Sequence, residues 1–246
     1  SWLSQNIIIV KPNTSFDNFQ YYNDETSLEL INKLIKTFDT GIDKVRVEKT
    51  DFEEFRKALP AKVFDLVMKD IRNKMAHKSL YSSARMTMRT DKSFFTDDEP
   101  IVSTLKLYHG KSFYDFNFDE ESDGTRRIFD LLDMLLNKND DIIYVVDELE
   151  RSLHPKLTEH FLELFMNFHK GHKTQLLFTT YEASIMEQKL FRRDEIWFVE
   201  RDGNNTSNVY SLDKFKERYD KTLSKAYLEG RYGAIPVFSN FDLTEE

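Results

Sequence analysis

The spacing of hydrophobic and polar positions changes near residue 119. Before this point the pattern is mixed, with apolar runs at strand spacing between helical stretches. The expected elements are a strand at 7–10, a helix between its N-cap Thr26 and Gly41, a strand at 44–49, a helix at 52–59 capped by Asp51, a helix from Pro60 to Met75 and a hairpin at 101–118. The pattern of residues 1–118 therefore predicts a short core strand followed by a mixed α+β region.

From residue 119 onward the pattern is a strict alternation of helix and strand. The expected elements are helices at 124–136 and 155–168, strands at 142–146, 175–180, 195–200 and 208–211, and a last helix ending at Gly230. The run Ile142–Val146 is apolar throughout, as expected of a strand covered on both faces. Helices between such strands predict parallel pairing with right-handed crossovers, so residues 119–246 predict an α/β domain.

Composition narrows the class of protein. The chain has 246 residues, of which 40% are hydrophobic and 32% charged, so we expect a folded protein. The longest apolar run, five residues, is too short to span a bilayer, and we expect neither a membrane protein nor a secretory signal. There is no cysteine, which excludes disulfides and thiolate metal sites and suits a cytoplasmic setting. A net charge of −8 gives little support to nucleic-acid binding, although a local basic patch stays open.

The most informative segment is the apolar strand at 142–146 and the two carboxylates after it, Asp147 and Glu148. In nucleotide hydrolysis a carboxylate at the end of a strand holds Mg²⁺, and a second one polarises the attacking water. Adjacent residues of a strand point to opposite faces, so the two carboxylates would serve different partners. The pattern also arises without function, when an Asp-Glu pair simply caps a helix.

Polar segments flank this pair on both sides. Ser122, Asp123, Gly124 and Thr125 open the helix at 124–136, where free backbone N–H groups favour an anion. The same residues also suit an ordinary N-cap. After the carboxylates come Ser152–Pro155, and the strand at 175–180 ends at Tyr181.

This order and spacing resembles the C-terminal half of ATP-binding-cassette (ABC) ATPases, in the soluble branch related to RecF, SMC and OLD-type proteins. Ser122–Thr125 resembles the signature motif and Asp147-Glu148 resembles Walker B. Ser152–Pro155, with Ser152 and His154, resembles the D-loop, and Tyr181 lies at the switch position.

The resemblance implies an α/β fold of the P-loop NTPase class, with an ABC-type core and an α+β lobe inserted at residues 20–118. It implies ATP and Mg²⁺ as cofactors, with Asp147 at the metal and Glu148 and Tyr181 as catalytic residues. It also implies a homodimer, or a higher oligomer, in which Ser122–Thr125 contact ATP bound to the partner subunit.

Within that branch the chain is similar to prokaryotic AAA-family ATP-binding proteins of phage-defence systems, of the RloA and retron-associated type. The segments that carry this likeness are 38–42, 120–127, 194–200 and 230–236. The likeness implies antiviral defence, in which the nucleotide state controls an effector protein such as a nuclease.

The sequence departs from the family in two ways. The switch residue, normally histidine, is Tyr181, which cannot carry a positive charge at neutral pH. The alternative interpretation is that Tyr181 has no switch role and only caps its strand. No G-x-x-x-x-G-K-[ST] phosphate loop occurs in the 246 residues. The triplet Gly110–Ser112 imitates its end but runs into a strand, and we interpret it as a hairpin turn.

We therefore expect this chain to be the C-terminal part of a longer ATPase. The alternative is that the loop is lost and the fold serves as a nucleotide-independent interaction module, which dimerisation dependent on Mg-ATP would distinguish. A weaker alternative is direct DNA binding by the dimer.

Three further pairs have competing interpretations. Tyr21-Tyr22 either stacks on nucleic-acid bases or belongs to the core. Arg126-Arg127 either contacts phosphate from a partner subunit or is solvated. Arg192-Arg193 is expected at a helix end, where cations suit the helix dipole.

Overall fold

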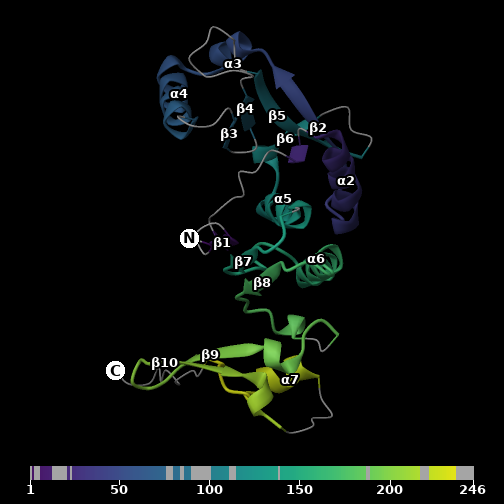
Figure 1. The fold of residues 1–246 in the computed structure, drawn as a ribbon, viewed down its shortest axis with the longest axis vertical. Coiled ribbons are helices and arrows are strands. Elements are labelled where there is room, and N and C mark those ends of the chain that lie inside the picture. The colour runs from purple at the N-terminus through teal and green to yellow at the C-terminus, as the bar shows by residue number, and fades with distance from the viewer. Residues whose placement is uncertain are drawn as a thin grey trace, which may run out of the picture.

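The computed structural model describes residues 2, 6–12, 21–22, 24–75, 80–83, 86–89, 101–110, 115–137, 139–186, 189–216 and 222–236. Figure 1 shows three regions along the long axis. An antiparallel sheet with α2–α4 lies at the top, a parallel sheet with α5 and α6 in the middle, and a hairpin with α7 at the bottom. No helix in these ranges has the length and apolar character needed to cross a membrane.

The parallel sheet has the strand order β1-β7-β8. The strands are β1 (Ile7–Val10), β7 (Ile143–Val146) and β8 (Gln175–Phe178). Ile9 pairs with Val145, which pairs with Leu177 on its other side. The expected parallel pairing of these strands is therefore confirmed, and β7 is the central strand.

Two helices cover one face of this sheet. They are α5 (Asp123–Leu136) and α6 (Pro155–Phe168), and Figure 1 shows both beside β7 and β8. Tyr144 of β7 is 1% exposed, and its ring meets Phe165 of α6 edge-on at 6.1 Å between centroids. Burial raises the pKa of the Tyr144 phenol to about 12, and Asn137 donates a hydrogen bond of 2.8 Å to it. The α/β arrangement with flanking helices is thus confirmed.

A five-stranded antiparallel sheet occupies the region before α5. Its order is β2-β5-β4-β3, with β6 also on β5. Its strands are β2 (Ile42–Thr50), β3 (Leu80–Ser83), β4 (Met86–Arg89), β5 (Ile101–His109) and β6 (Asp115–Asn117), and its helices are α2 (Glu25–Ile35), α3 (Phe52–Ala58) and α4 (Ala61–Met75). The predicted hairpin is confirmed in the pairing of β5 with β6. That this region is a lobe inserted in the core stays a prediction.

The buried side chains of α2 and of the turn that follows it pack in the same hydrophobic core as the parallel sheet. Ile31, Ile35 and Phe38 belong to the same buried cluster as Tyr144 and Val146. Asn32 fixes α2 to β2, because its side chain accepts from the backbone of Val45 at 2.7 Å and donates back to it at 3.0 Å. The two sheets therefore rest on one continuous hydrophobic core.

The N-cap of α2 is Asp24 and not the predicted Thr26. The Asp24 carboxylate accepts from the backbone and the hydroxyl of Ser27, at 2.9 and 2.6 Å. The helix also ends earlier than Gly41, because Lys36–Phe38 form a 3-10 turn and Asp39 takes a left-handed φ of 51°. Asp and Thr are both good N-caps, so the sequence pattern could not choose between the two turns.

The C-terminal hairpin does not extend the parallel sheet. Within the described residues, β9 (Trp197–Arg201) pairs only with β10 (Ser207–Ser211), antiparallel to it. The hairpin packs on α7 (Leu223–Leu228) through Phe198, Leu212 and Tyr232. The expected alternation of helix and strand therefore stops at β8, and the described parts of the connection to β9 contain two 3-10 turns, Ala183–Ile185 and Arg193–Glu195.

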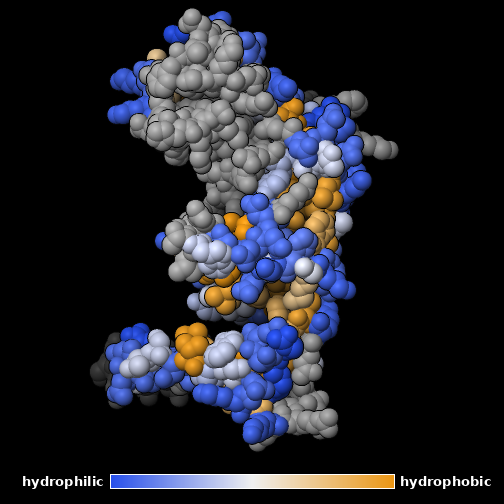
Figure 2. Space-filling view, viewed as in Figure 1, coloured by the Kyte–Doolittle hydropathy of each residue, from blue (hydrophilic) through white to orange (hydrophobic). Residues whose placement is uncertain are grey.

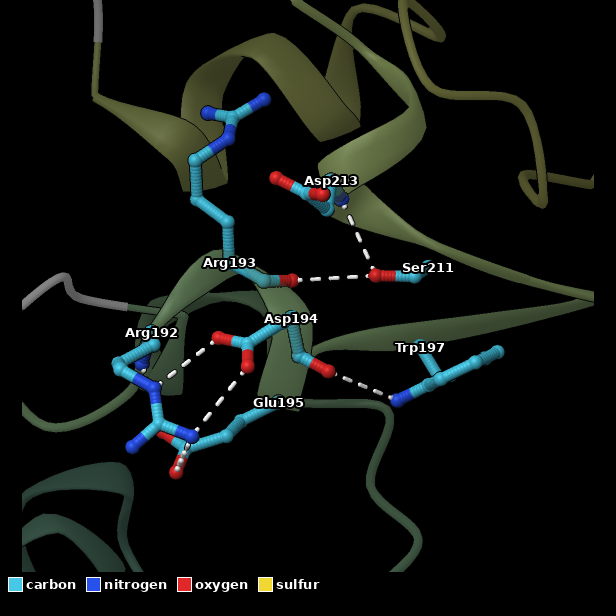
Figure 3. A network of polar contacts seen from close by, with 7 residues as sticks. All are labelled: Arg192, Arg193, Asp194, Glu195, Trp197, Ser211 and Asp213. Atoms are coloured by element: carbon cyan, nitrogen blue, oxygen red, sulfur yellow. Dashed lines mark hydrogen bonds and ion pairs between the residues drawn. The ribbon is translucent and has the colours of Figure 1, made fainter.

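The arginine pair 192–193 begins one of these turns and does not end a helix as expected (Figure 3). Arg192 pairs with Asp194 at 3.1 Å. Arg193 donates to the backbone carbonyls of Leu212, at 3.2 Å, and Phe215. Trp197 donates its indole N–H to the carbonyl of Asp194 at 3.0 Å. Arg192 thus stabilises the turn itself, and Arg193 fixes the turn to the residues that follow β10.

The N-cap of α2 provides a test of the fold. Asp24→Ala removes two hydrogen bonds to Ser27, so we expect the free energy of unfolding to fall by about 1 kcal/mol. Thr26→Ala, on the exposed first turn, should change it by less than about 0.5 kcal/mol. Urea denaturation measures both, and an equal loss in the two variants would contradict the assignment of the cap.

Candidate site at the carboxyl edge of the parallel sheet

The chain after β7 is fixed by both neighbouring strands. Asp147 donates its backbone N–H to Val10 of β1 at 2.9 Å. On the other side, Thr179 donates to Val146 at 2.9 Å and accepts from Leu149 at 3.1 Å. The backbone that carries the predicted carboxylates is therefore held at the carboxyl ends of all three strands, where ligands bind in open α/β sheets.

Thr179 organises the two carboxylate residues. Its hydroxyl donates to the Asp147 carboxylate at 2.6 Å and accepts from the Glu148 backbone N–H at 2.9 Å. The Asp147 side chain is exposed, so one oxygen is oriented by Thr179 while the carboxylate faces solvent. The sequence marks Thr179 only by its place at the end of the next strand, just before Tyr181.

Glu148 adopts an unusual backbone conformation. Its φ is +50°, a left-handed value that costs energy in a residue with a side chain. The strand ends at Val146, so Asp147 and Glu148 lie in the loop beyond it. The expected strand alternation of the two side chains therefore does not apply, because both residues lie beyond the strand. Such strain persists where the surroundings enforce it, and here Thr179 and the fully buried Leu149 do so.

The N-terminus of α5 has the features of an ordinary cap. Ser122 is the N-cap, and its hydroxyl accepts from the Thr125 backbone at 3.1 Å. Asp123 pairs with Arg126 on the surface at 2.5 Å. The capping interpretation is thus confirmed, and an anion seat at these residues stays a prediction.

Gly124 is required by close packing between two of the predicted motifs. A Cβ atom at Gly124 would lie 2.7 Å from the backbone oxygen of Ser152, closer than any side chain tolerates. Ser152 has a left-handed φ of +62°. His154 follows as the N-cap of α6, accepting from Lys156 at 3.2 Å. The structure therefore brings the predicted signature and D-loop residues together within one chain.

A buried arginine contacts the loop that carries the two carboxylates. Arg127 is 5% exposed and donates to the Glu148 carbonyl at 3.4 Å. Burial lowers the pKa of Arg127, while the nearby Asp130 acts in the opposite direction. Arg127 is thus neither solvated nor directed to a partner subunit, and Arg126 pairs with Asp123 at the surface. The neighbourhood of Arg127 also contains Glu150.

Tyr181 lies at the end of β8 with its side chain 87% exposed. Its backbone N–H donates to the Glu150 carboxylate at 2.9 Å, which fixes the main chain. A role for its phenol as a switch stays a prediction.

Gly110, the first residue of the triplet 110–112, follows a strand of the antiparallel sheet and not of the parallel one. Gly110, with a φ of +56°, follows β5, and β5 pairs antiparallel with β6. Residues 111–114 lie outside the described part. The pairing agrees with the predicted hairpin turn.

Tyr22, the second residue of the aromatic pair 21–22, belongs to the core. Tyr22 is 1% exposed, with its ring 6.4 Å from that of Phe129. The interpretation that Tyr22 stacks on nucleic-acid bases is therefore wrong, because its ring is not accessible. Tyr21 is half-buried, and burial raises the pKa of its phenol to about 12.

The residues at this edge fit a magnesium–nucleotide complex. Magnesium in such sites is held by one or two carboxylates together with phosphate oxygens and water, and Asp147 offers one exposed carboxylate with a fixed orientation. Across the described ranges no group of three or more His, Asp or Glu side chains is placed to hold a metal ion.

The chain matches the model of a known family. Residues 15–187 match the model of the family described as "AAA domain, putative AbiEii toxin, Type IV TA system". The match covers more than two thirds of the chain, includes every predicted site residue and ends before β9. No curated protein matches the chain.

The Thr179 hydroxyl provides a test of the site. Thr179→Val removes the contacts to Asp147 and Glu148, and we expect Mg²⁺-dependent nucleotide binding by the native polypeptide to weaken about 10- to 100-fold. Thr180→Val is the control, because the Thr180 hydroxyl accepts only a local bond from Glu182 at 3.0 Å. Calorimetric titration measures both affinities. Equal affinities in the two variants would show that Thr179 does not position the carboxylate.

Proposed function

The chain belongs to this family of AAA domains, and we propose that it supplies the Walker B, signature and D-loop residues of an ATP-hydrolysing site. Membership places the chain among nucleotide-binding ATPases related to those of defence systems, as the sequence resemblance implied. The finer assignments below rest on the site geometry together with that membership.

The observation that carries the proposal is the pair of carboxylates beyond β7. Asp147 is held by Thr179 in a fixed orientation, and Glu148 follows it in a left-handed backbone conformation. Magnesium bound with ATP would neutralise charge on the phosphates. Asp147 would hold that ion, directly or through water. Glu148 would then accept a proton from the water that attacks the terminal phosphate.

The remaining parts of the site would come from two other places. The phosphate loop would lie in an earlier segment of the same polypeptide. Ser122, Asp123, Gly124 and Thr125 of one protomer would contact ATP bound to the other, in a head-to-tail dimer. The contact between Gly124 and Ser152 supports this scheme, because it couples the signature to the D-loop of its own protomer. Ser152 and His154 would then lie near both nucleotides.

The biological role proposed here rests on family likeness. We infer that ATP turnover controls an effector protein, such as a nuclease, in prokaryotic antiviral defence. Residues 20–118 would form the lobe that meets this partner. The setting would be the cytoplasm, and direct binding of nucleic acid has little support from a net charge of −8.

A second function of a different class is a nucleotide-independent interaction module on a decayed ATPase fold. Two observations favour it: Tyr181 at the switch position and the absence of a phosphate-loop sequence from these 246 residues. The carboxylate oriented by Thr179 favours the ATPase instead, because a decayed site has no need to hold Asp147.

Replacement of Glu148 tests the ATPase assignment. In the native polypeptide, Glu148→Gln keeps the size and hydrogen-bonding capacity of the side chain but removes the base. We expect ATP to bind normally and turnover to fall at least about 100-fold. Glu163→Gln, on the exposed surface of α6, is the control and should retain wild-type turnover. Turnover and ATP binding are measured on the same samples.

Each outcome decides between the two functions. Wild-type turnover in Glu148→Gln would remove Glu148 from the mechanism. A wild-type polypeptide that neither binds nor hydrolyses ATP would support the interaction module.

A further inference from the structure

Three carboxylates lie next to Ser122 in the sequence, at the point where α5 opens. They belong to Glu120, Glu121 and Asp123. In the dimer proposed above, the first turn of α5 contacts the phosphates of ATP bound to the partner subunit. A free carboxylate beside that turn would repel the phosphates, because charges within about 10 Å of each other are only partly screened by salt. Access of an anion to the turn therefore depends on where these side chains are held.

Two of the three carboxylates are held by local contacts. Glu120 accepts from the backbone N–H of Asn117 at 2.6 Å and so caps the 3-10 turn Phe118–Glu120. Asp123 pairs with Arg126 at 2.5 Å. Both contacts join residues three positions apart, so they need nothing from the rest of the fold.

Glu121 is held by a distant strand instead. Its Oε1 lies 2.5 Å from Nε2 of His109, the last residue of β5. An ionised carboxylate only accepts hydrogen bonds, so Nε2 donates. The Glu121 side chain is 8% exposed, and within the part of the chain that the structure describes no other side chain bonds to it. A carboxylate this buried is costly without a partner, so the orientation of Glu121 depends on His109.

His109 is itself fixed by the antiparallel sheet. Its backbone pairs with Ile42 at the start of β2, and its ring meets Phe116 of β6 edge-on at 5.2 Å between centroids. On the Nδ1 side the ring faces Gly41, where a Cβ atom would lie 3.4 Å away. The imidazole is thus held by its neighbours, with Nε2 directed at Glu121.

The turn that carries Gly41 also contacts α6. The Thr37 hydroxyl lies 2.8 Å from Nε2 of His160 on α6, and the buried Phe38 packs edge-on against the same imidazole. Figure 2 shows that the upper and middle regions join without a gap over α2, whereas a hollow separates the middle region from the lowest one. The support that holds His109 is therefore fixed to the helices of the parallel sheet.

The first turn of α5 leaves backbone N–H groups open. The Ser122 hydroxyl uses the N–H of Thr125, at 3.1 Å. The N–H groups of Asp123 and Gly124 precede it in the first turn, where a helix supplies no acceptor of its own. Such groups attract a carboxylate of the same chain as they attract a phosphate. A released Glu121 side chain, adjacent to this turn in the sequence, would therefore compete for them.

We propose that His109 is a positioning residue: it holds the Glu121 carboxylate away from the first turn of α5 and thereby keeps that turn open to the phosphates of ATP on the partner subunit. The proposal deepens the ATPase function and rests on it for the identity of the anion. A purely structural ion pair would stabilise the fold and no more. The positioning role predicts in addition that removing the charge of Glu121 compensates for the loss of His109.

ATP-dependent dimerisation of the native polypeptide tests this role. The parent carries Glu148→Gln, which blocks turnover, and sedimentation in Mg-ATP gives the dimer Kd. His109→Phe keeps a ring against Phe116 but cannot donate to Glu121. We expect it to raise the dimer Kd at least about 10-fold, because a released charge then faces the phosphates. Adding Glu121→Gln to His109→Phe should return Kd to within about threefold of the parent, since the two residues act as a pair.

His172→Ala is the matched control. It removes another histidine–carboxylate contact, to Asp140 at 3.7 Å, before the strands of the parallel sheet begin, and should leave the dimer Kd unchanged. Glu121→Gln alone keeps the test decisive if His109→Phe folds poorly, because it preserves an acceptor for His109. It should dimerise at least as tightly as the parent, and a tenfold weaker dimer would overturn the proposal.

The remaining outcomes separate this proposal from the ATPase function. A His109→Phe variant with the Kd of the parent would overturn the positioning role alone. A loss that Glu121→Gln does not restore would leave the pair a structural role only and would also overturn it. A parent that does not dimerise in Mg-ATP would contradict the proposed ATPase dimer itself, and the positioning role would fall with it.

Discussion

The pairing of β7 on both of its edges is the constraint from which the site follows. Val10 on one side and Thr179 on the other accept from the backbone just beyond the strand, at Asp147 and Leu149. These bonds fix where the chain leaves the sheet. The Thr179 hydroxyl then orients the Asp147 carboxylate, and the left-handed Glu148 continues the loop toward the buried Leu149. Backbone contacts between neighbouring strands thus fix the loop, and one side chain, that of Thr179, fixes the Asp147 carboxylate within it.

The same edge is joined to the rest of the molecule by a few close contacts. Gly124 approaches Ser152 where no side chain would fit, and the buried Arg127 donates to the Glu148 carbonyl. One residue before the cap of α5, Glu121 binds His109 at the end of β5, with 2.5 Å between Oε1 and Nε2. The antiparallel sheet is therefore linked to the helix that opens at the site by a direct side-chain contact.

Much of this arrangement could be predicted from sequence because it depends on local pattern. The apolar run before Asp147, the spacing of α5 and α6, and the hairpin around Gly110 each follow from periodicity and turn residues. Contacts between distant segments could not be predicted. The role of Thr179, the burial of Tyr22 and Arg127, and the separation of β9 from β8 all depend on which segments meet in space. The cap of α2 was missed because Asp24 and Thr26 satisfy the same local rule.

The account is tested most directly by ATP-dependent binding of a divalent metal at Asp147. Manganese can replace magnesium in oxygen-rich sites and is followed by electron paramagnetic resonance. The account predicts that the native polypeptide binds Mn²⁺ with ATP at one site per protomer, and that Asp147→Asn weakens this binding at least about tenfold. Unchanged Mn²⁺ binding in Asp147→Asn, or none in the wild type with ATP present, would contradict it.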